Sequence, residues 1–455
     1  MTAAGNPATL HGAPEHCALP NTPLAEARAG LDACVHCGFC LQSCPTYVVL
    51  EDENDSPRGR LLLMRSLLEG SLKTEDEAVR GHLDRCLGCR ACETACPSGV
   101  PYGHLLEATR ATLTARHPLP FAARLLLGVF ARPRLMAIAM TFARLMRGSR
   151  LAAVLARVIP GRFGFALDML EATRVPVPRR RYEPEAEGSR ASVAMLEGCV
   201  MRGLYAETNA ATTRTLRVNG YRCVDAEGQS CCGALHAHAG DLATARRLAK
   251  RNIEAFERSG AERIVSNAAG CGAMMKEYGQ LLAGDPEWAS RAARMSGRAR
   301  DVSELLADAG PVEGGPLEVT VTYDAPCHLL HAQRISAPPL TVLASIPGVK
   351  LVPLVDAEFC CGAAGIYNLL EPDTSAAVLA PKLDRIEETR STLVATGNPG
   401  CLMQIGAGLI RRGSDARAVH PVDLLDASYG KRFAPKKATM SKVLPDAADS
   451  ADSAD

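Results

Sequence analysis

Two copies of one cysteine motif constrain this 455-residue chain more than any other feature. The motif reads C-x2-C-x2-C-x3-C-P. Its members are Cys34, Cys37, Cys40 and Cys44 in the first copy, and Cys86, Cys89, Cys92 and Cys96 in the second. Three thiolates spaced in this way let one tight loop surround three corners of a 4Fe–4S cluster, and the proline turns the chain away with the fourth. The eight cysteines are therefore predicted to be the metal ligands of two 4Fe–4S clusters.

The fourth cysteine of each copy is predicted to serve the cluster of the other copy, as it does in two-motif proteins. One cluster then belongs to Cys34, Cys37, Cys40 and Cys96, and the other to Cys86, Cys89, Cys92 and Cys44. Zinc is the alternative metal, but zinc sites usually place a longer stretch between two ligand pairs. Zinc would make the chain a scaffold that only assembles other proteins.

The segment between the two motifs predicts a helical domain. Its apolar residues Leu61, Leu62, Met64, Leu67 and Leu68 follow a helical stripe. The sequence therefore favours an α-helical cluster domain over residues 31–110. The arginines at 58 and 60 either place positive charge near the anionic clusters or begin a solvated helix.

The second half of the chain contains an internal repeat. Its members are Cys199, Cys231, Cys232 and Cys271 in the first copy, and Cys327, Cys360, Cys361 and Cys401 in the second, at offsets of 128 to 130 residues. Strand-like runs precede the first and last cysteine of each copy, and helical stretches such as 242–256 lie between. Strands alternating with helices predict two α/β domains of parallel type. Ligands in such folds gather at the carboxyl ends of the strands, so each domain is expected to place four cysteines at that rim. Core packing of the thiols is the alternative.

Charge is distributed unevenly along the chain, although the net charge is only +1. Residues 108–167 contain ten arginines, no lysine and no acidic residue, interleaved with apolar runs. This pattern predicts two or three basic amphipathic helices, split near Pro133 and Gly148. They are expected either to lie on an anionic membrane surface or to pack on partner subunits.

Several classes of protein are excluded by the remaining composition. A near-neutral chain is not expected to bind nucleic acid. The N-terminal residues lack the features of a secretory signal, so the thiols are expected to stay reduced. Arginines interrupt the longest apolar region, so no membrane-spanning helix is predicted. The chain has no G-x-G-x-x-G fingerprint, Walker loop or G-x-S-x-G elbow. No catalytic residue is therefore predicted, and the clusters are expected to carry electrons for another subunit.

Taken together, ACVHCGFCLQSCPTY, DSPRGR, HLDRCLGCRACETACPSGV, LEGC, CCGA, GCGAMMKEYGQ and CHLLHAQR resemble the iron–sulfur subunit of bacterial glycolate oxidase over roughly residues 30–430. The resemblance implies a membrane-associated complex with a flavin-binding catalytic subunit and a second flavin-domain subunit. FAD is expected only on those partners. Glycolate is oxidised to glyoxylate there, and the electrons pass through this chain to an acceptor such as quinone. The implied location is cytoplasmic, at the inner face of the cell membrane. The iron–sulfur subunits of anaerobic glycerol-3-phosphate dehydrogenase and of lactate utilisation share this layout and remain alternatives.

The repeated region resembles the cysteine-rich CCG domains of heterodisulfide reductases. There the last motif ends C-x2-C, and the domain can bind a further iron–sulfur cluster. In this chain Met274 and Gln404 occupy the position of the missing fifth cysteine. The eight cysteines of the repeat therefore either bind an additional cluster or have a structural or quinone-facing role.

The predicted fold class is α+β multidomain, with an α-helical two-cluster ferredoxin domain, a helical connector and two tandem α/β CCG domains. The predicted order is a mobile N-terminus (1–30), the ferredoxin domain (31–110), basic amphipathic helices and linker (111–190), CCG domain 1 (191–312), CCG domain 2 (313–430) and a disordered tail (431–455).

For several single residues the sequence allows either a structural or a functional role. His328 and His331 either tune the second CCG site, or hydrogen-bond a quinone, or are structural. His236 and His238 carry the same alternatives beside the first cysteine pair. His36 is expected to point to solvent, and the cysteines at 17 and 223 are predicted to be free thiols.

Overall fold

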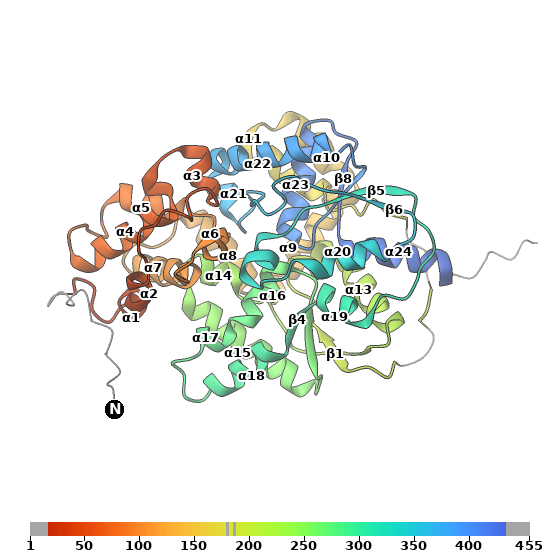
Figure 1. The fold of residues 1–455 in the computed structure, drawn as a ribbon, viewed down its shortest axis with the longest axis horizontal. Coiled ribbons are helices and arrows are strands. Elements are labelled where there is room, and N and C mark those ends of the chain that lie inside the picture. Colours follow the sequence, from red (N-terminus) through yellow and green to blue (C-terminus); the bar gives the residue numbers. More distant parts are fainter. Residues whose placement is uncertain (1–16, 179–181, 185–187, 434–455) are drawn as a thin grey trace, which may run out of the picture.

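The structure is a computed structural model that describes residues 17–178, 182–184 and 188–433. A helical N-terminal domain lies at one end of the molecule, and two α/β domains occupy the other (Figure 1). The predicted α+β multidomain class is confirmed by this arrangement. Most of the predicted mobile N-terminus (1–30) and of the predicted disordered tail (431–455) lies outside the described residues. Where the structure describes these segments it contains helix, at Pro23–Glu26 and from Arg28 in the first and up to Phe433 in the second.

The N-terminal domain is built from helices alone within the described residues. They are α1 (Pro23–Glu26), α2 (Arg28–Asp32), α3 (Pro45–Leu50), the 3-10 turn η1 (Glu53–Asp55), α4 (Pro57–Glu69), α5 (Glu77–Asp84), α6 (Ala91–Ala95) and α7 (Tyr102–Arg116). Helix α4 begins where the Ser56 hydroxyl accepts a hydrogen bond from the Gly59 amide, and it ends at Gly70 in the left-handed conformation. Met64 and Leu67, from the predicted apolar stripe, are buried in the domain core.

Each α/β domain contains a four-stranded parallel sheet. The strands are β1 (Ser192–Met195), β2 (Arg222–Val224), β3 (Arg263–Ser266) and β4 (Ala299–Asp301) in the first domain, and β5 (Val319–Tyr323), β6 (Val349–Val352), β7 (Leu393–Ala395) and β8 (Arg417–Val419) in the second. The orders are β2-β1-β3-β4 and β6-β5-β7-β8, so the second domain repeats the topology of the first. In each sheet the second strand lies on one side of the first strand and the third strand lies on the other. The strand order therefore switches between β1 and β3, and between β5 and β7. Such switch points are where α/β sheets bind ligands.

Helices surround both sheets. In the first domain they are α12 (Val200–Leu204), α13 (Ala206–Val218), α14 (Ala234–His238), α15 (Leu242–Arg258), α16 (Ala269–Lys276), α17 (Tyr278–Leu281), α18 (Ala289–Arg298) and α19 (Val302–Ala309). In the second they are the π-helical turn η2 (His328–Ala332), α20 (Ala337–Ala344), α21 (Tyr367–Leu370), α22 (Pro372–Glu388), α23 (Pro399–Arg411) and α24 (Pro421–Phe433). The apolar periodicity of a helix explains why it covers a sheet. On α15, Leu248, Ile253 and Phe256 share one buried face, which packs in the core of the first domain.

The two α/β domains pack closely against each other. One hydrophobic core runs through both sheets, and it includes Val193 and Val265 of the first domain and Val321 of the second. Polar contacts join α13 to α24: the Thr208 hydroxyl donates to a carboxylate oxygen of Asp423 at 2.9 Å. The tandem repeat therefore folds as a pair with a shared interior.

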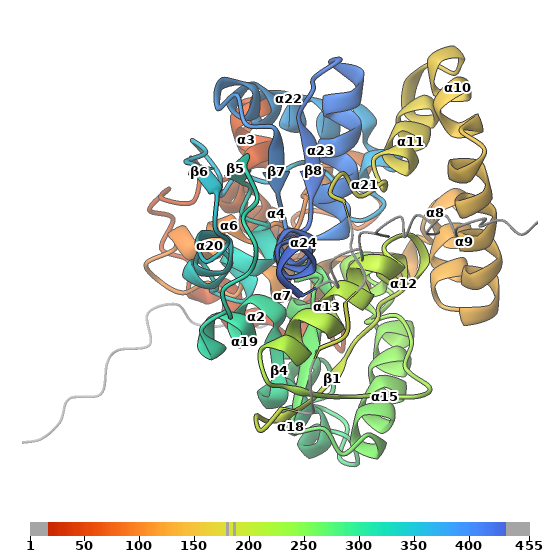
Figure 2. The same cartoon turned by 90° about the vertical axis from the view of Figure 1, so that its right-hand side faces the viewer.

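Residues between the helical domain and the first sheet form four more helices, which we call the helical arm. They are α8 (Phe121–Phe130), α9 (Pro133–Gly148), α10 (Leu151–Val158) and α11 (Gly161–Glu171). The arm stands along one side of the α/β domains (Figure 2). The breaks predicted at Pro133 and Gly148 are present. They separate three helices, α8, α9 and α10, as predicted. A fourth helix, α11, begins beyond a further break at Pro160 and continues into the acidic residues that follow the basic segment.

Candidate metal centres and the cavity between them

The first group of motif cysteines lies at the surface of the helical domain. Cys34, Cys37 and Cys40 occupy the loop between α2 and α3, and Cys96 follows α6. All four line one small hollow together with Cys92 of the second motif, whereas Cys44 does not line it. Burial, with smaller contributions from the neighbouring thiols of Cys34, Cys44 and Cys96, raises the pKa of Cys40 to about 11. The structure thus brings the fourth cysteine of the second motif to the loop of the first.

The second group of motif cysteines is buried. Cys86, Cys89 and Cys92 are buried, and the buried Cys44 of the first motif is a neighbour of Cys89 and Cys92. Burial, followed by the neighbouring thiols of Cys89, Cys86 and Cys44, raises the pKa of Cys92. Cys44 is therefore a neighbour of the second group, and the exchange of fourth cysteines, like the metal ligands themselves, stays a prediction.

Polar hydrogens point at the sulfur atoms of the second group. The Arg60 guanidinium is fully buried, and its Nη1 lies 3.9 Å from Cys44 Sγ. The Tyr102 hydroxyl donates to Cys86 Sγ at 3.6 Å, and the Gly88 amide donates to the same sulfur at 3.5 Å. These donors suit thiolates that carry negative charge. The surroundings therefore fit an anionic iron–sulfur cluster.

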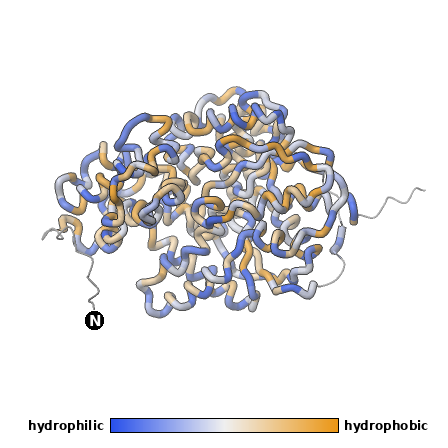
Figure 3. The backbone as a smooth tube through the Cα atoms, viewed as in Figure 1, coloured by the Kyte–Doolittle hydropathy of each residue, from blue (hydrophilic) through white to orange (hydrophobic). Residues whose placement is uncertain are grey.

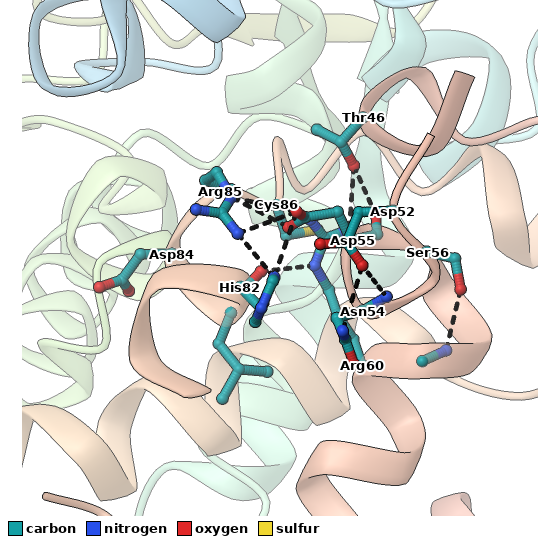
Figure 4. A network of polar contacts seen from close by, with 12 residues as sticks. Thr46, Asp52, Asn54, Asp55, Ser56, Arg60, His82, Asp84, Arg85 and Cys86 are labelled. Carbon is teal, nitrogen blue, oxygen red and sulfur yellow. Dashed lines mark hydrogen bonds and ion pairs between the residues drawn. The ribbon is translucent and has the colours of Figure 1, made fainter. Parts of the chain in front are cut away.

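A buried carboxylate holds Arg60 in place (Figure 4). Asp55 Oδ1 lies 3.1 Å from Arg60 Nη2, and its Oδ2 lies 2.9 Å from Arg85 Nη2 and 3.2 Å from His82 Nδ1. Asp52, Asp55 and His82 are close enough to hold a metal ion, but the two guanidinium groups already satisfy Asp55. We therefore assign this group as an ion-pair network. By contrast, Arg58 pairs with Glu53 near the surface.

The cysteines of the repeat form two groups of four, which we call tetrad 1 and tetrad 2. In tetrad 1, Cys199 follows β1, Cys271 lies in the first turn of α16, and the pair Cys231 and Cys232 precedes α14. Hydrogen bonds between side chains link Cys199 to Cys231, Cys231 to Cys232, and Cys232 to Cys271. The first of these bonds raises the pKa of Cys199 and lowers that of Cys231.

Tetrad 2 repeats this arrangement in the second α/β domain. Its links join Cys327 to Cys360, Cys360 to Cys361, and Cys361 to Cys401. The bond to Cys360 raises the pKa of Cys327 and lowers that of Cys360. Each tetrad therefore offers four converging thiols at the carboxyl ends of two strands, a soft donor set that suits iron or zinc.

The residues at the position of the missing fifth cysteine do not supply a further metal ligand. Gln404 is fully buried, its Nε2 donates to Ser375 Oγ at 2.9 Å, and its Oε1 accepts from Asn368 Nδ2 at 2.9 Å. Met274 packs in the core of the first domain. Gln404 is fully engaged elsewhere, and any metal at tetrad 2 would depend on thiols and neighbours other than this residue.

A cavity of about 640 Å³ lies between the two tetrads. All eight cysteines of the tetrads line it, together with Cys86 and Leu87 of the helical domain and with Pro120 and Phe130 at the start of the arm. Cys89 and Cys360 belong to one hydrophobic cluster, so the second group of motif cysteines adjoins tetrad 2. Such a cavity is large enough for a small organic molecule.

Among the histidines, His328 fits a functional role best. It lines the cavity, its Nδ1 lies 3.6 Å from Cys327 Sγ, and its Nε2 is buried with no hydrogen-bond partner among the described residues. Burial, followed by His238 and Arg90, lowers its pKa to about 3, so the imidazole is neutral. His238 also lines the cavity, and its Nδ1 lies 2.8 Å from Glu107 Oε1.

The other histidines and the two isolated cysteines show no feature that favours a functional role. His331 bridges the hydroxyl of Thr94 and the carbonyl oxygen of Glu358. His236 is buried and contacts the Leu127 carbonyl oxygen of the arm. His36 is exposed as expected. Cys17 and Cys223 lie outside both tetrads and both motif groups.

Sequence reasoning missed the residues that join the domains at this site. Arg110 was counted only as part of the basic segment. Its Nη2 donates to the carbonyl oxygens of Leu83, Asp84 and Cys86, and its Nη1 donates to that of His238 at 2.9 Å. No motif marks such a residue, because its partners lie far away in the sequence.

Comparisons with known proteins agree with this organisation. Residues 30–100 match the family described as "4Fe-4S dicluster domain", and residues 193–276 and 321–406 match "Cysteine-rich domain". The chain is 37% identical to the "Probable glycolate oxidase iron-sulfur subunit" of Bacillus subtilis, over 88% of this chain and 94% of that protein. It is 36% identical to the "Glycolate oxidase iron-sulfur subunit" of Escherichia coli, over 84% and 91%. "Lactate utilization protein A" of Geobacillus kaustophilus is 30% identical over 52% of this chain and 98% of that protein.

Proposed function

Because this chain belongs to the family of glycolate oxidase iron–sulfur subunits, we propose that it is the electron-transfer subunit of a flavin-dependent glycolate-oxidising complex. The observation that carries this proposal is the pairing of two four-cysteine groups in one helical domain, with the second group beside a cavity. The substrate is expected to bind to a flavin-containing catalytic subunit, with a second flavin-domain subunit in the same complex.

The two cysteine groups are the proposed cluster ligands. Cys34, Cys37, Cys40 and Cys96 would hold the first 4Fe–4S cluster, and Cys86, Cys89, Cys92 and Cys44 the second. When bound, each cluster accepts and releases one electron at a time. This chain buries the second group and aims donors at its sulfur atoms, whereas Cys37 in the first group is exposed.

The surface around the first group suits a docking partner. Val35 and Phe39 flank Cys37, and their exposed fractions are 68% and 69%. Apolar side chains exposed at such levels on a cysteine loop favour contact with another protein. We place the flavin-containing subunit on this loop, so that electrons enter the chain at the exposed group and leave from the buried one.

The proposed acceptor is a quinone, and the cavity between the tetrads is its proposed site. The unpartnered Nε2 of neutral His328 could donate a hydrogen bond to a quinone carbonyl, while Leu87 and Phe130 supply apolar walls. Reduction of a quinone to a quinol takes two electrons and two protons. The His238 ring contacts that of His328, and His238 in turn contacts Glu107; both are partly exposed and could conduct protons to His328.

The test uses the whole complex, purified under argon with its flavin subunits. Glycolate should reduce the iron–sulfur clusters, which is followed by electron paramagnetic resonance, and L-lactate or glycerol 3-phosphate should not. Reduction by L-lactate alone would favour the lactate-utilisation alternative. That alternative is supported by the similarity of about half of this chain to a lactate utilization protein. Reduction of the flavin with no change at the clusters would contradict the proposed role of this chain.

A Val35→Ser, Phe39→Ser variant tests the entry surface. It should copurify with less of the flavin-containing subunit and keep its iron. A Val355→Ser variant, at an exposed apolar side chain of the second α/β domain, is the control.

A further inference from the structure

The helical arm exposes apolar side chains in unusual number. Of the nineteen large hydrophobic side chains that are exposed among the described residues, ten lie on the arm. They are Phe121, Leu125, Leu135, Ile138, Phe142, Leu145, Leu151, Val154, Val158 and Phe163. A concentration of this kind on one segment marks an interaction surface.

The exposed side chains follow the periodicity of their helices. On α9, Leu135, Ile138, Phe142 and Leu145 are spaced three or four residues apart, so they share one outward face. The opposite face of α9 is buried at Met136 and packs against α12. Helix α9 therefore has an inner side that attaches it to the protein and an outer side that is apolar and has no partner among the described residues.

Arginines surround these apolar faces. The exposed ones are Arg124, Arg132, Arg134, Arg144, Arg150, Arg157 and Arg162. No ion pair joins any of the seven to a carboxylate within the part of the chain that the structure describes. The exposed charge of the arm between residues 120 and 167 is thus of one sign.

The surface could contact either a partner protein or a lipid bilayer, and the single sign of its charge favours the bilayer. A protein partner commonly presents charges of both signs around an apolar centre, and its interface mirrors them. The headgroup region of an anionic bilayer presents negative charge everywhere, with hydrocarbon directly beneath it. Apolar faces whose neighbouring charges are all arginines are complementary to such a bilayer.

The geometry of the arm favours a position within the membrane surface. No single described helix is long and apolar enough to cross a membrane. Helices α8 and α9 reach that length and composition only together, and they are bent by 99° at the break between them. Helices arranged in this way suit the interface between headgroups and acyl chains.

We propose that α8–α11 dock this subunit on an anionic lipid bilayer, with the apolar faces inserted and the arginines among the headgroups. The arm also reaches the cavity, because Ala123 and Phe130 of its first helix, and Pro120 just before that helix, line the space. Docking thereby brings the cavity to the membrane surface. The proposal rests on the proposed function only in this last step, where a lipid-soluble acceptor enters from the bilayer.

Vesicle sedimentation with the full chain, purified under argon with its metal, tests the proposal. The chain should bind vesicles of phosphatidylcholine with phosphatidylglycerol, and bind vesicles of phosphatidylcholine alone far more weakly. An Arg134→Gln, Arg144→Gln, Arg157→Gln variant should bind the anionic vesicles roughly a hundredfold more weakly. The matched control replaces the exposed Arg222, Arg247 and Arg258 by glutamine and should bind like the unchanged chain.

A second variant tests insertion of the apolar faces. Ile138→Ser with Phe142→Ser should weaken binding to anionic vesicles, whereas Leu340→Ser with Val355→Ser, also at exposed side chains, should not. Failure of the full chain to bind anionic vesicles would overturn the proposal. So would arm variants that bind vesicles normally but lose the flavin subunits, because the surface would then belong to a protein partner. Iron content is measured in every sample, so loss of the clusters is distinguished from loss of membrane binding.

Discussion

Replacing Arg60 should lower the midpoint potential of the second iron–sulfur cluster and leave the first unchanged. Arg60 is fully buried, and its Nη1 lies 3.9 Å from Cys44 Sγ. Burial by itself disfavours the charged guanidinium, but negative neighbours that include Cys86 and Cys44 outweigh this effect and raise the pKa of Arg60. The charge is therefore permanent, and it favours the more negative, reduced state of a cluster held by Cys44.

The size of the shift follows from Coulomb's law. Two unit charges 3.9 Å apart interact by about 4 kcal/mol at an effective dielectric constant of about 20. Asp55, 3.1 Å from the other Nη of Arg60, offsets part of this attraction. If about half remains, the change is about 2 kcal/mol, or about 90 mV for one electron.

The assay is a redox titration followed by electron paramagnetic resonance on the Arg60→Met chain. Asp55 keeps Arg85 and His82 as partners in this variant, so the domain is expected to fold and retain its iron. Arg58→Met is the matched control, because Arg58 pairs with Glu53 near the surface and should matter much less. An unchanged midpoint in Arg60→Met, or a shift confined to the cluster of the first group, would refute the reasoning.

Three further predictions concern other parts of the molecule. Cys44→Ser should disturb the signal of the cluster held by Cys86, Cys89 and Cys92, and Cys96→Ser the other signal; electron paramagnetic resonance showing the reverse would contradict the exchange of fourth cysteines. Gln404→Ala should leave the iron content unchanged but cost about 1–3 kcal/mol of unfolding free energy, because Asn368 and Ser375 lose their partner; loss of iron without loss of stability would be the contrary result. Burial lowers the pKa of His420 to about 4, against about 6.5 when unfolded, so the neutral ring stabilises the fold above pH about 6.5. This stability, up to about 3 kcal/mol, should disappear as the pH falls towards 4, and urea unfolding of His420→Gln should show a weaker dependence over that range.

Much of the fold could be predicted because local patterns and topology agree. Apolar runs before Cys199 and Cys271 are strands β1 and β3, which are adjacent in the sheet, so the repeat alone brought these cysteines together. The exchange between Cys44 and Cys96 is expected from the behaviour of two-motif proteins and stays a prediction. The pairing of the strands could be predicted because it depends on residues within one sheet.

The different roles of Arg58 and Arg60 could have been read from the helix period. Arg60 lies four residues before Met64 and seven before Leu67, so it shares their buried face, whereas Arg58 lies two residues away on the opposite side. The cavity could not be predicted. It forms where the helical domain, the arm and both α/β domains meet, and contacts such as that of Arg110 with the His238 carbonyl join residues with no common pattern.

The central claim is that the eight motif cysteines hold two four-iron clusters. Iron and acid-labile sulfide analysis combined with Mössbauer spectroscopy, on the chain purified under argon, tests it most directly. We predict at least about eight iron atoms and about eight sulfides per chain, with the spectrum of 4Fe–4S clusters. A colourless chain that contains zinc and no iron would contradict the account and would favour an assembly scaffold instead.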